Sequence, residues 1–143
     1  MVSTLAETRD FLRGDHQIPI YYEDTDLSGF VYHANYLKFF ERAREHLIGV
    51  EYLKTLWHSG VHFVVSEANI KYLRPAKHGD LLTIRSEVSY SRSPLLLCKQ
   101  SAYRETNGKE DLIAQADICL VTLNGKNKPM RLPEFVIENF RKQ

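Results

Sequence analysis

The sequence predicts a single α+β domain in which a curved antiparallel sheet wraps around one long helix. Apolar residues recur at helical spacing over residues 35–48, which predicts the one strong amphipathic helix. After Gly60 the apolar residues begin to alternate, and four strand-like runs follow on short connections. A single aromatic helix is then the element available to cover the apolar face of the sheet.

Length and composition narrow the class of protein. A chain of 143 residues fits one domain, and a 43% hydrophobic and 26% charged composition is that of an ordinary globular protein. With 19 basic and 18 acidic residues, the net charge of +1 gives no reason to expect a nucleic-acid partner. We find no apolar run with the length of a signal peptide or a membrane span, and Cys98 and Cys119 stand alone in apolar runs. We therefore expect a cytoplasmic protein with reduced cysteines.

The chain begins with polar residues before its first predicted strand. Residues 1–16 are predicted to form a loosely ordered arm, and residues 17–143 the domain itself. The first strand is expected at residues 17–22, where Pro19 favours an edge or a strand start. Residues 24–29 have the composition of a loop.

The predicted helix has two distinct faces. The apolar face contains Tyr36, Phe39, Phe40, Ala43 and Leu47. The opposite face is expected to contain charged side chains, and Gly49 is expected to end the helix. These charged residues are Glu41, Arg42, Arg44 and Glu45.

The second half of the chain is predicted to be mostly strands. Asn107–Gly108 predicts a hairpin turn between the third and fourth runs. Because sequential strands on short connections usually pair, we expect neighbours in sequence to be neighbours in the sheet. The strands are expected at residues 61–73, 82–90, 95–105 and 112–123, with shorter helices at 51–57 and, with Pro133 in its first turn, at 133–141.

Acidic residues and a histidine are concentrated just before the helix. Glu23, Asp24 and Asp26 precede Gly29, and His33 stands at the helix entry. An isolated Asp in such a position usually takes part in a turn, and an isolated His usually makes a local hydrogen bond. The N–H groups of Tyr32 to Asn35, at the first turn of the helix, are expected to lack helical partners, so they are candidate donors to an oxyanion. The cluster therefore predicts a candidate site at the start of the helix.

The run YEDTDLSGFVYHANYLKFFERAR resembles the signature of the hotdog-fold thioesterases, in the 4-hydroxybenzoyl-CoA thioesterase branch and nearest the Tol–Pal-associated acyl-CoA thioesterases. The similarity continues through VSEANIKYLRPAKHGDLL and the tail KNKPMRLP. The resemblance implies a five-stranded sheet around one helix, edge-to-edge homodimers that often pair into homotetramers, and active sites at the dimer interface. It also implies hydrolysis of an acyl-CoA thioester. Leu27–Ser28 is bulkier at its first position than the small residues expected there, so the resemblance does not identify the acyl group of the substrate.

The resemblance places the catalytic carboxylate on Asp26 and the histidine on His33. Asp26 serves as nucleophile or as general base, and the sequence does not choose between these roles. Crowding by Glu23 and Asp24 raises its pKa and the helix N-terminus lowers it, and we expect the second effect to keep it ionised. Glu23 and Asp24 are expected to accept hydrogen bonds from the loop backbone. The oxyanion and substrate set is Tyr32, Asn35, Tyr36, Val61 and His62, and the weaker CoA-binding set is Arg74, Lys77, Arg92 and Lys99.

Two other functions remain open. The same fold supports a hydratase or dehydratase acting on acyl thioesters, or a module that binds an acyl thioester or a protein partner without turnover. The substrate is acyl-CoA, with an acyl-carrier protein as a further possibility. The histidines show no metal-ligand spacing and the chain has no Gly-rich phosphate loop, so we expect no metal and no cofactor.

Overall fold

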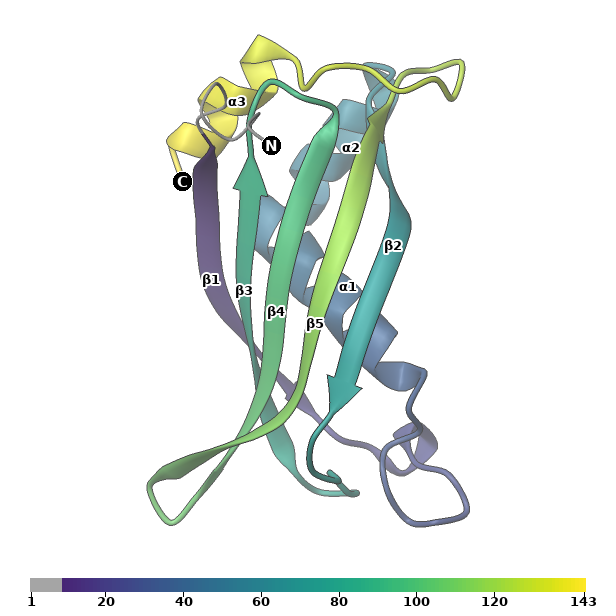
Figure 1. Cartoon of the computed structure of the whole chain (residues 1–143), viewed down its shortest axis with the longest axis vertical. Coiled ribbons are helices and arrows are strands. Elements are labelled where there is room, and N and C mark those ends of the chain that lie inside the picture. Colours follow the sequence, from purple (N-terminus) through teal and green to yellow (C-terminus); the bar gives the residue numbers. More distant parts are fainter. Residues whose placement is uncertain (1–8) are drawn as a thin grey trace, which may run out of the picture.

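The computed structural model describes residues 9–143 as a five-stranded antiparallel sheet with helices against one face (Figure 1). The strand order is β1-β3-β4-β5-β2. None of the helices in this part of the chain is long and apolar enough to span a membrane. The strands are β1 (Asp10–Pro19), β2 (His62–Tyr72), β3 (Leu81–Tyr90), β4 (Leu95–Thr106) and β5 (Lys109–Leu123), and the helices are η2 (Tyr22–Asp24), α1 (Asn35–Ile48), α2 (Val50–His58) and α3 (Glu134–Arg141).

The core lies between α1 and the sheet. Phe39 and Phe40 are fully buried, and Tyr36 and Ala43 flank them on the same face of α1. The predicted helix has the observed bounds, and Gly49 ends it with a φ of 106°. Burying such aromatic side chains against a sheet is worth several kcal/mol each when measured by truncation, about 3–5 for Phe to Ala.

The first strand is longer than predicted. β1 begins at Asp10 and pairs with β3 along its whole length, from Asp10 opposite Tyr90 to Pro19 opposite Leu81. The prediction of a loose arm is therefore wrong for residues 10–16, while residues 1–8 lie outside the described part of the chain. Residues 10–16 are mostly polar, which suggested an arm, but their side chains alternate between the two faces of the sheet as in a half-buried strand, and Leu12 is buried.

The pairing of the second strand also differs from the prediction. β2 does not lie beside β3; it pairs with β5 at the far edge of the sheet. Residues 73–80 carry the chain across, because β1 already occupies the free side of β3. The Asn107–Gly108 turn is confirmed, with φ values of 54° and 78° that suit a hairpin turn.

The shorter helices lie close to the predicted places. α2 and α3 each match to within about a residue at most ends, a difference within the usual scatter of helix boundaries. Pro133 precedes the first turn of α3 as its N-cap residue and does not lie inside the turn.

Arg44 is the main exception to the predicted faces of α1. It lies one turn after Phe40 on the face toward the sheet, and it is only 7% exposed. Its Nη1 donates to Gln100 Oε1 at 3.0 Å. Gln100 Nε2 in turn donates to Ser86 Oγ and to the Phe40 carbonyl, both at 2.9 Å. Burial lowers the pKa of Arg44.

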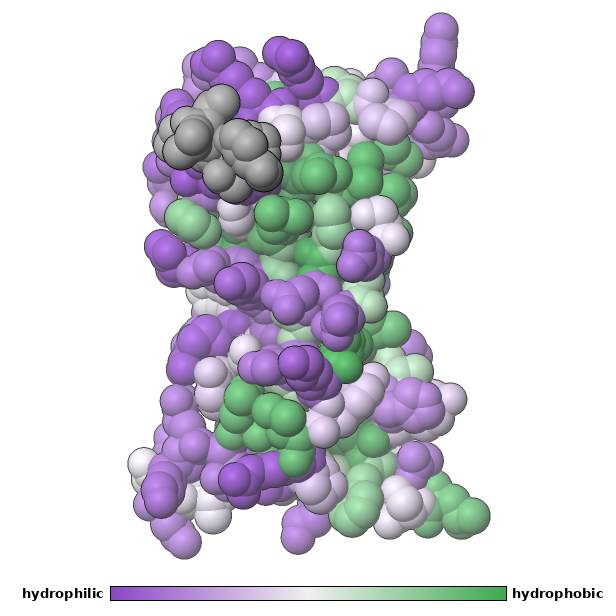
Figure 2. All heavy atoms as spheres, in the orientation of Figure 1, coloured by the Kyte–Doolittle hydropathy of each residue, from purple (hydrophilic) through white to green (hydrophobic). Residues whose placement is uncertain are grey.

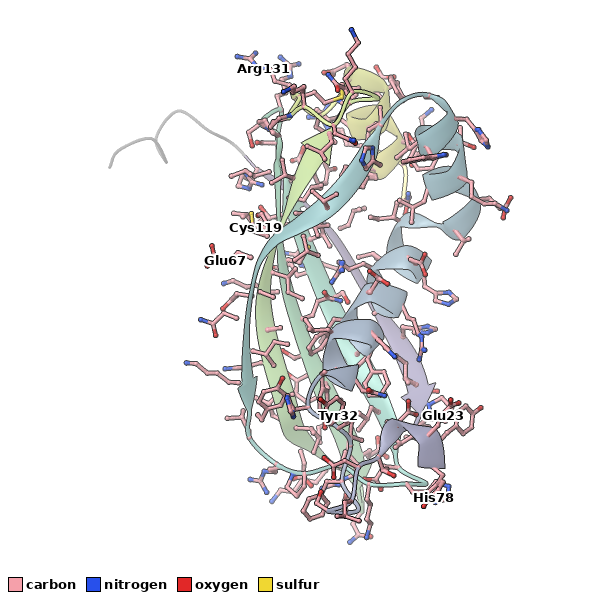
Figure 3. All side chains as sticks on the ribbon, turned by 90° about the vertical axis from the view of Figure 1, so that its right-hand side faces the viewer. Glu23, Tyr32, Glu67, His78, Cys119 and Arg131 are labelled. Carbon is pink, nitrogen blue, oxygen red and sulfur yellow. The ribbon has the colours of Figure 1, made fainter. Side chains whose placement is uncertain are left out.

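The outer face of the sheet, away from α1, carries an apolar group. Figure 2 shows apolar side chains gathered on the upper part of this face. Leu95 lies opposite Val121 there, and Leu97 opposite Cys119. Figure 3 shows Cys119 and Glu67 pointing away from α1.

Candidate active site

The loop before α1 is fixed by a buried carboxylate. Asp24 is 7% exposed, and its two oxygens accept hydrogen bonds from Tyr21 N at 2.9 Å and from Asn35 Nδ2 at 3.0 Å. Its carbonyl accepts the N–H of Tyr32 at 2.8 Å. Asp24 thus ties the two ends of the loop to the start of α1, as expected of a structural acid. Glu23 is exposed and points outward (Figure 3).

Asp26 lies at the exposed tip of this loop. Its carbonyl accepts the N–H of Gly29 at 3.0 Å, and the φ of 87° at Gly29 suits a residue without a side chain. One carboxylate oxygen, Oδ1, accepts the N–H of Ser28 at 2.8 Å and also its hydroxyl. Within residues 9–143 the other oxygen, Oδ2, accepts no hydrogen bond. The turn geometry therefore leaves one oxygen of Asp26 available to a ligand.

The pKa of Asp26 lies below its ordinary value. The Ser28 hydroxyl is the largest cause, the Ser28 N–H is the next favourable one, and His33 adds a smaller favourable charge. The expected direction, toward an ionised Asp26, agrees with this result. The main cause differs from the expected one. Hydrogen bonds from Ser28 lower the pKa of Asp26, whereas we expected the N-terminus of the helix to do so.

His33 is held at the other side of the same depression. Its carbonyl accepts the Tyr72 hydroxyl at 2.9 Å, and its ring lies 4.6 Å from the Tyr32 ring and 6.2 Å from the Tyr72 ring, centre to centre. Tyr36 lies beneath, where burial is the main cause that raises its pKa to about 12. A cavity of about 310 Å³ is lined by Asp26, Ser28, Phe30, Val31, His33, Tyr36, Tyr72, Leu73, Arg74 and Pro75.

Tyr72 is a residue of this cavity that the sequence reasoning missed. It ends β2, far from the loop in sequence, and only the crossing of β2 to the edge of the sheet brings it to His33. The available signal was an aromatic residue at the end of a strand, which is too common to be specific.

Two of the four N–H groups from Tyr32 to Asn35 that were expected to be free have backbone partners. The Tyr32 N–H is bonded to Asp24, and the Asn35 N–H to the Tyr32 carbonyl at 2.9 Å. The Asn35 side chain donates one hydrogen bond to Asp24, so Asn35 helps to hold the loop against the start of α1. Within the described residues the N–H groups of His33, Ala34 and Tyr36 have no backbone partner. These three are the better candidate oxyanion donors.

Val61 and His62 lie in a different place from Asp26. The Val61 N–H donates to the Leu56 carbonyl at 2.8 Å, so it is not free for a substrate. Both residues line a second pocket, of about 770 Å³, between the second half of α1, α2 and the start of β2. Within one chain these two residues are therefore separated from the Asp26 cavity.

The four predicted CoA-binding cations do not form one cluster. Arg74 lines the Asp26 cavity, and Lys77 is close by, since its backbone bridges to Phe30 in the loop. Lys99 lies on β4 on the outer face of the sheet. Arg92 pairs with Glu134 of α3 at 3.3 Å. Only Arg74 and Lys77 are placed near the candidate site of their own chain.

A long helix held against a curved antiparallel sheet is the arrangement of a hotdog fold. Residues 21–140 match the family model described as the thioesterase-like superfamily. The chain belongs to this family, which confirms the family and the fold expected from the sequence.

Two curated relatives and one solved structure are similar over most of the chain. The acyl-CoA thioester hydrolase YbgC of Escherichia coli O6:H1 is 34% identical over 127 residues, 87% of this chain and 92% of that protein. The acyl-CoA thioesterase YbgC of Haemophilus influenzae is 38% identical over 128 residues, 83% of this chain and 88% of that protein. The structure of 4-hydroxybenzoyl-CoA thioesterase from Pseudomonas sp. strain CBS-3 has a TM-score of 0.77 and 22% identity, and the alignment covers 89% of this chain and 98% of that one.

Proposed function

We propose that this chain hydrolyses the thioester bond of acyl-CoA substrates and that Asp26 is the reactive carboxylate. One observation carries the proposal: Asp26 has a lowered pKa and one free oxygen, and it shares a cavity with His33 at the amide-rich start of α1. The names of the curated relatives, acyl-CoA thioester hydrolase and acyl-CoA thioesterase, support the same reaction.

Two routes are consistent with this geometry. Asp26 attacks the thioester carbon, expels the CoA thiolate and leaves a mixed anhydride that water then hydrolyses. Alternatively, Asp26 takes a proton from water, the hydroxide adds to the carbon, and the thiolate leaves from the tetrahedral intermediate. In both routes the free N–H groups of His33, Ala34 and Tyr36 stabilise the oxyanion, and the His33 side chain donates a proton to the leaving sulfur.

The active site is completed by a second copy of the chain. β2 is an edge strand that remains exposed on both faces from Val64 to Asn69, and Val65 is 48% exposed. An edge strand presents unpaired backbone N–H and C=O groups, and proteins usually cover or protect such an edge. Pairing two copies of β2 about a two-fold axis would extend the sheet and cover it.

Antiparallel pairing of the β2 edges brings opposite ends of the two strands together. The partner subunit's His62 then lies beside Tyr72, which contacts His33. The second pocket of one subunit therefore adjoins the Asp26 cavity of the other. Large exposed apolar side chains surround the loop, which supports its being covered in the dimer: Tyr22, Leu27, Phe30 and Tyr32. Leu27 points to solvent in the single chain and does not fill a pocket of its own subunit.

The outer face offers a contact for pairing of dimers. Leu95 and Leu97 are about two-fifths exposed in an apolar group that no described segment covers. A homotetramer formed through this face would bury them, and sedimentation velocity distinguishes it from a dimer.

Release of free thiol tests the proposed reaction. Wild-type protein is assayed with a thiol reagent on a panel of acyl-CoA and acyl-carrier-protein substrates, together with Asp26→Asn and the surface control Asp117→Asn. Asn keeps an oxygen to accept the Ser28 N–H, so the loop should hold its shape while kcat falls about 10²–10⁴-fold. Asp117→Asn should retain normal turnover.

The outcomes separate the rival functions. A hydratase or dehydratase releases no thiol, and a binding module binds a thioester without releasing any. Near-normal turnover by Asp26→Asn would show that Asp26 is not the reactive group. Mass spectrometry after rapid quenching distinguishes the routes, because only nucleophilic attack leaves an acylated chain.

A further inference from the structure

The second pocket combines apolar walls with a buried cation. It lies between β2 and the helices, at the edge that faces the viewer in Figure 3. Its walls include Ile48, Leu53, Val61, Phe63 and Leu120. Arg44 also lines this pocket, although its side chain is more than nine-tenths buried. An apolar pocket with one fixed polar group is the usual form of a site that orients a small organic group.

The guanidinium of Arg44 has unused hydrogen-bonding capacity. It presents five N–H donors, of which the described residues engage one, the Nη1 bond to Gln100. Its partner is a neutral amide, and within residues 9–143 no carboxylate lies within ion-pair distance of it. A buried charge without a counter-charge is costly, and a ligand oxygen that meets the free donors would offset this cost.

The other charged groups around the pocket lie at its rim. Glu41, Glu45 and Lys54 are exposed side chains of α1 and α2, and the His58 and His62 rings lie nearer the surface than Arg44. Burial lowers the pKa of Arg44, and Glu41 and Glu45 still act on it and raise its pKa, but by less, because water screens exposed charges more than buried ones. The buried charged side chain among the residues that line the pocket is therefore Arg44.

We propose that this pocket receives the acyl group and that Arg44 recognises an oxygen acceptor at its far end. The preferred substrates are monothioesters of dicarboxylic acids, followed by ω-hydroxyacyl thioesters, over plain aliphatic chains of equal length. This inference rests on the proposed function and on the paired β2 edges, which place the pocket of one subunit beside the Asp26 cavity of the other. Arg44 is thus a specificity-determining residue.

A matched set of substrates tests the inference. Adipoyl-CoA, 6-hydroxyhexanoyl-CoA and hexanoyl-CoA have the same chain length and differ in the terminal group, and each is corrected for hydrolysis without enzyme. The wild-type kcat/KM for adipoyl-CoA should exceed that for hexanoyl-CoA by about 10- to 100-fold, the range expected of a hydrogen bond to a charged group. The hydroxyacyl substrate should fall between them.

Three variants locate the effect. Arg44→Met keeps most of the volume and should bring the adipoyl-to-hexanoyl ratio close to one, mainly through KM for adipoyl-CoA. Arg44→Lys keeps the charge and should retain part of the ratio. Arg42→Met is the matched control, because Arg42 is exposed on the opposite face of α1, and it should leave both rates unchanged.

A binding measurement covers the case in which Arg44→Met fails to fold. Adipate should inhibit wild-type hydrolysis of hexanoyl-CoA at least about tenfold more strongly than hexanoate does. Equal inhibition, or hydrolysis of the three thioesters at equal rates, would overturn the role of Arg44 and leave the thioesterase proposal intact. Failure to hydrolyse any acyl-CoA would contradict the proposed function and this inference together.

Discussion

The two edge strands of the sheet, β1 and β2, differ in how far other parts of the chain cover their side chains. At β1, apolar residues alternate inward, the His16 ring stacks on His46 of α1 at 4.0 Å, and Arg141 of α3 donates to Asp10 at 3.1 Å. Each edge strand pairs with one strand of the described sheet, β1 with β3 and β2 with β5, but β2 has six consecutive residues that are exposed on both faces. Side chains of α1 and α3 therefore cover part of β1, whereas β2 is the edge at which we propose that a second copy of the chain binds. The difference indicates where a second subunit would complete the active site.

A lysine placed on one edge strand at a time should show which of the two strands forms the dimer interface. Val65 on β2 and Phe11 on β1 are similarly exposed, at 48% and 45%. Val65→Lys should raise the dimer dissociation constant at least about 100-fold, because the proposed pairing would bury an unpaired charge from each chain in the interface, and thiol release should fall with it. Phe11→Lys should remain at least dimeric and active. Sedimentation velocity on both variants checks this, and a Val65→Lys protein that assembles normally would exclude β2 as the interface.

The loop that follows β1 offers a second contrast, between two neighbouring acids. Asp24→Ala leaves the Tyr21 N–H and the Asn35 side chain without their acceptor, so the free energy of unfolding should fall by about 1–3 kcal/mol. Glu23→Ala should change it by less than about 0.5 kcal/mol, since Glu23 is exposed. Urea denaturation at one protein concentration measures both. Equal losses would mean that Asp24 does not hold the loop.

These contrasts also mark what the sequence could predict. The bounds of α1 follow from local spacing alone, and so does the Asn107–Gly108 turn. The pairing of β2 with β5 depends on which edges are already occupied, which no local pattern records. Arg44 was assigned to the wrong face because its charge was given more weight than its position four residues after Phe40.

Some residues of the candidate site could also be predicted from the sequence, and others could not. Asp26, His33 and Tyr36 line one cavity and were predictable, because they belong to one continuous motif. Tyr72 could not be predicted without the sheet order, and the place of Val61 and His62 in a separate pocket agrees with the proposed second subunit.

The contact between the end of β2 and His33 can be tested by removing one oxygen atom. Tyr72→Phe removes the hydroxyl that donates to the His33 carbonyl, and kcat/KM should fall about 2- to 12-fold, the equivalent of a typical hydrogen bond. Tyr103→Phe, which keeps the ring beneath Arg85 on the sheet, should leave the rate unchanged. If the two variants show the same rate, the Tyr72 bond does not position His33.

The smallest expected effect concerns pH. Because the folded-state pKa of Asp26 is lowered, the active carboxylate should persist above that pKa and be lost only as the pH falls through it, below the ordinary Asp range. Ser28→Ala removes the largest cause of the shift, so activity should begin to fall at a higher pH, while the Ser28 N–H bond limits the change. The acid limb of kcat/KM measures this, and an unmoved limb would mean that Asp26 does not set it.

Mixed dimers test the shared active site most directly. Asp26→Asn disables the carboxylate, and His62→Trp overfills the mouth of the second pocket, so neither protein should release thiol alone. After unfolding and refolding together, each mixed dimer should regain one intact site, with Asp26 from one chain and the pocket from the other. The mixture should recover up to about a quarter of wild-type activity, because half the dimers are mixed and each has one good site. No recovery, with mixed dimers shown to be present, would contradict a site built from two chains.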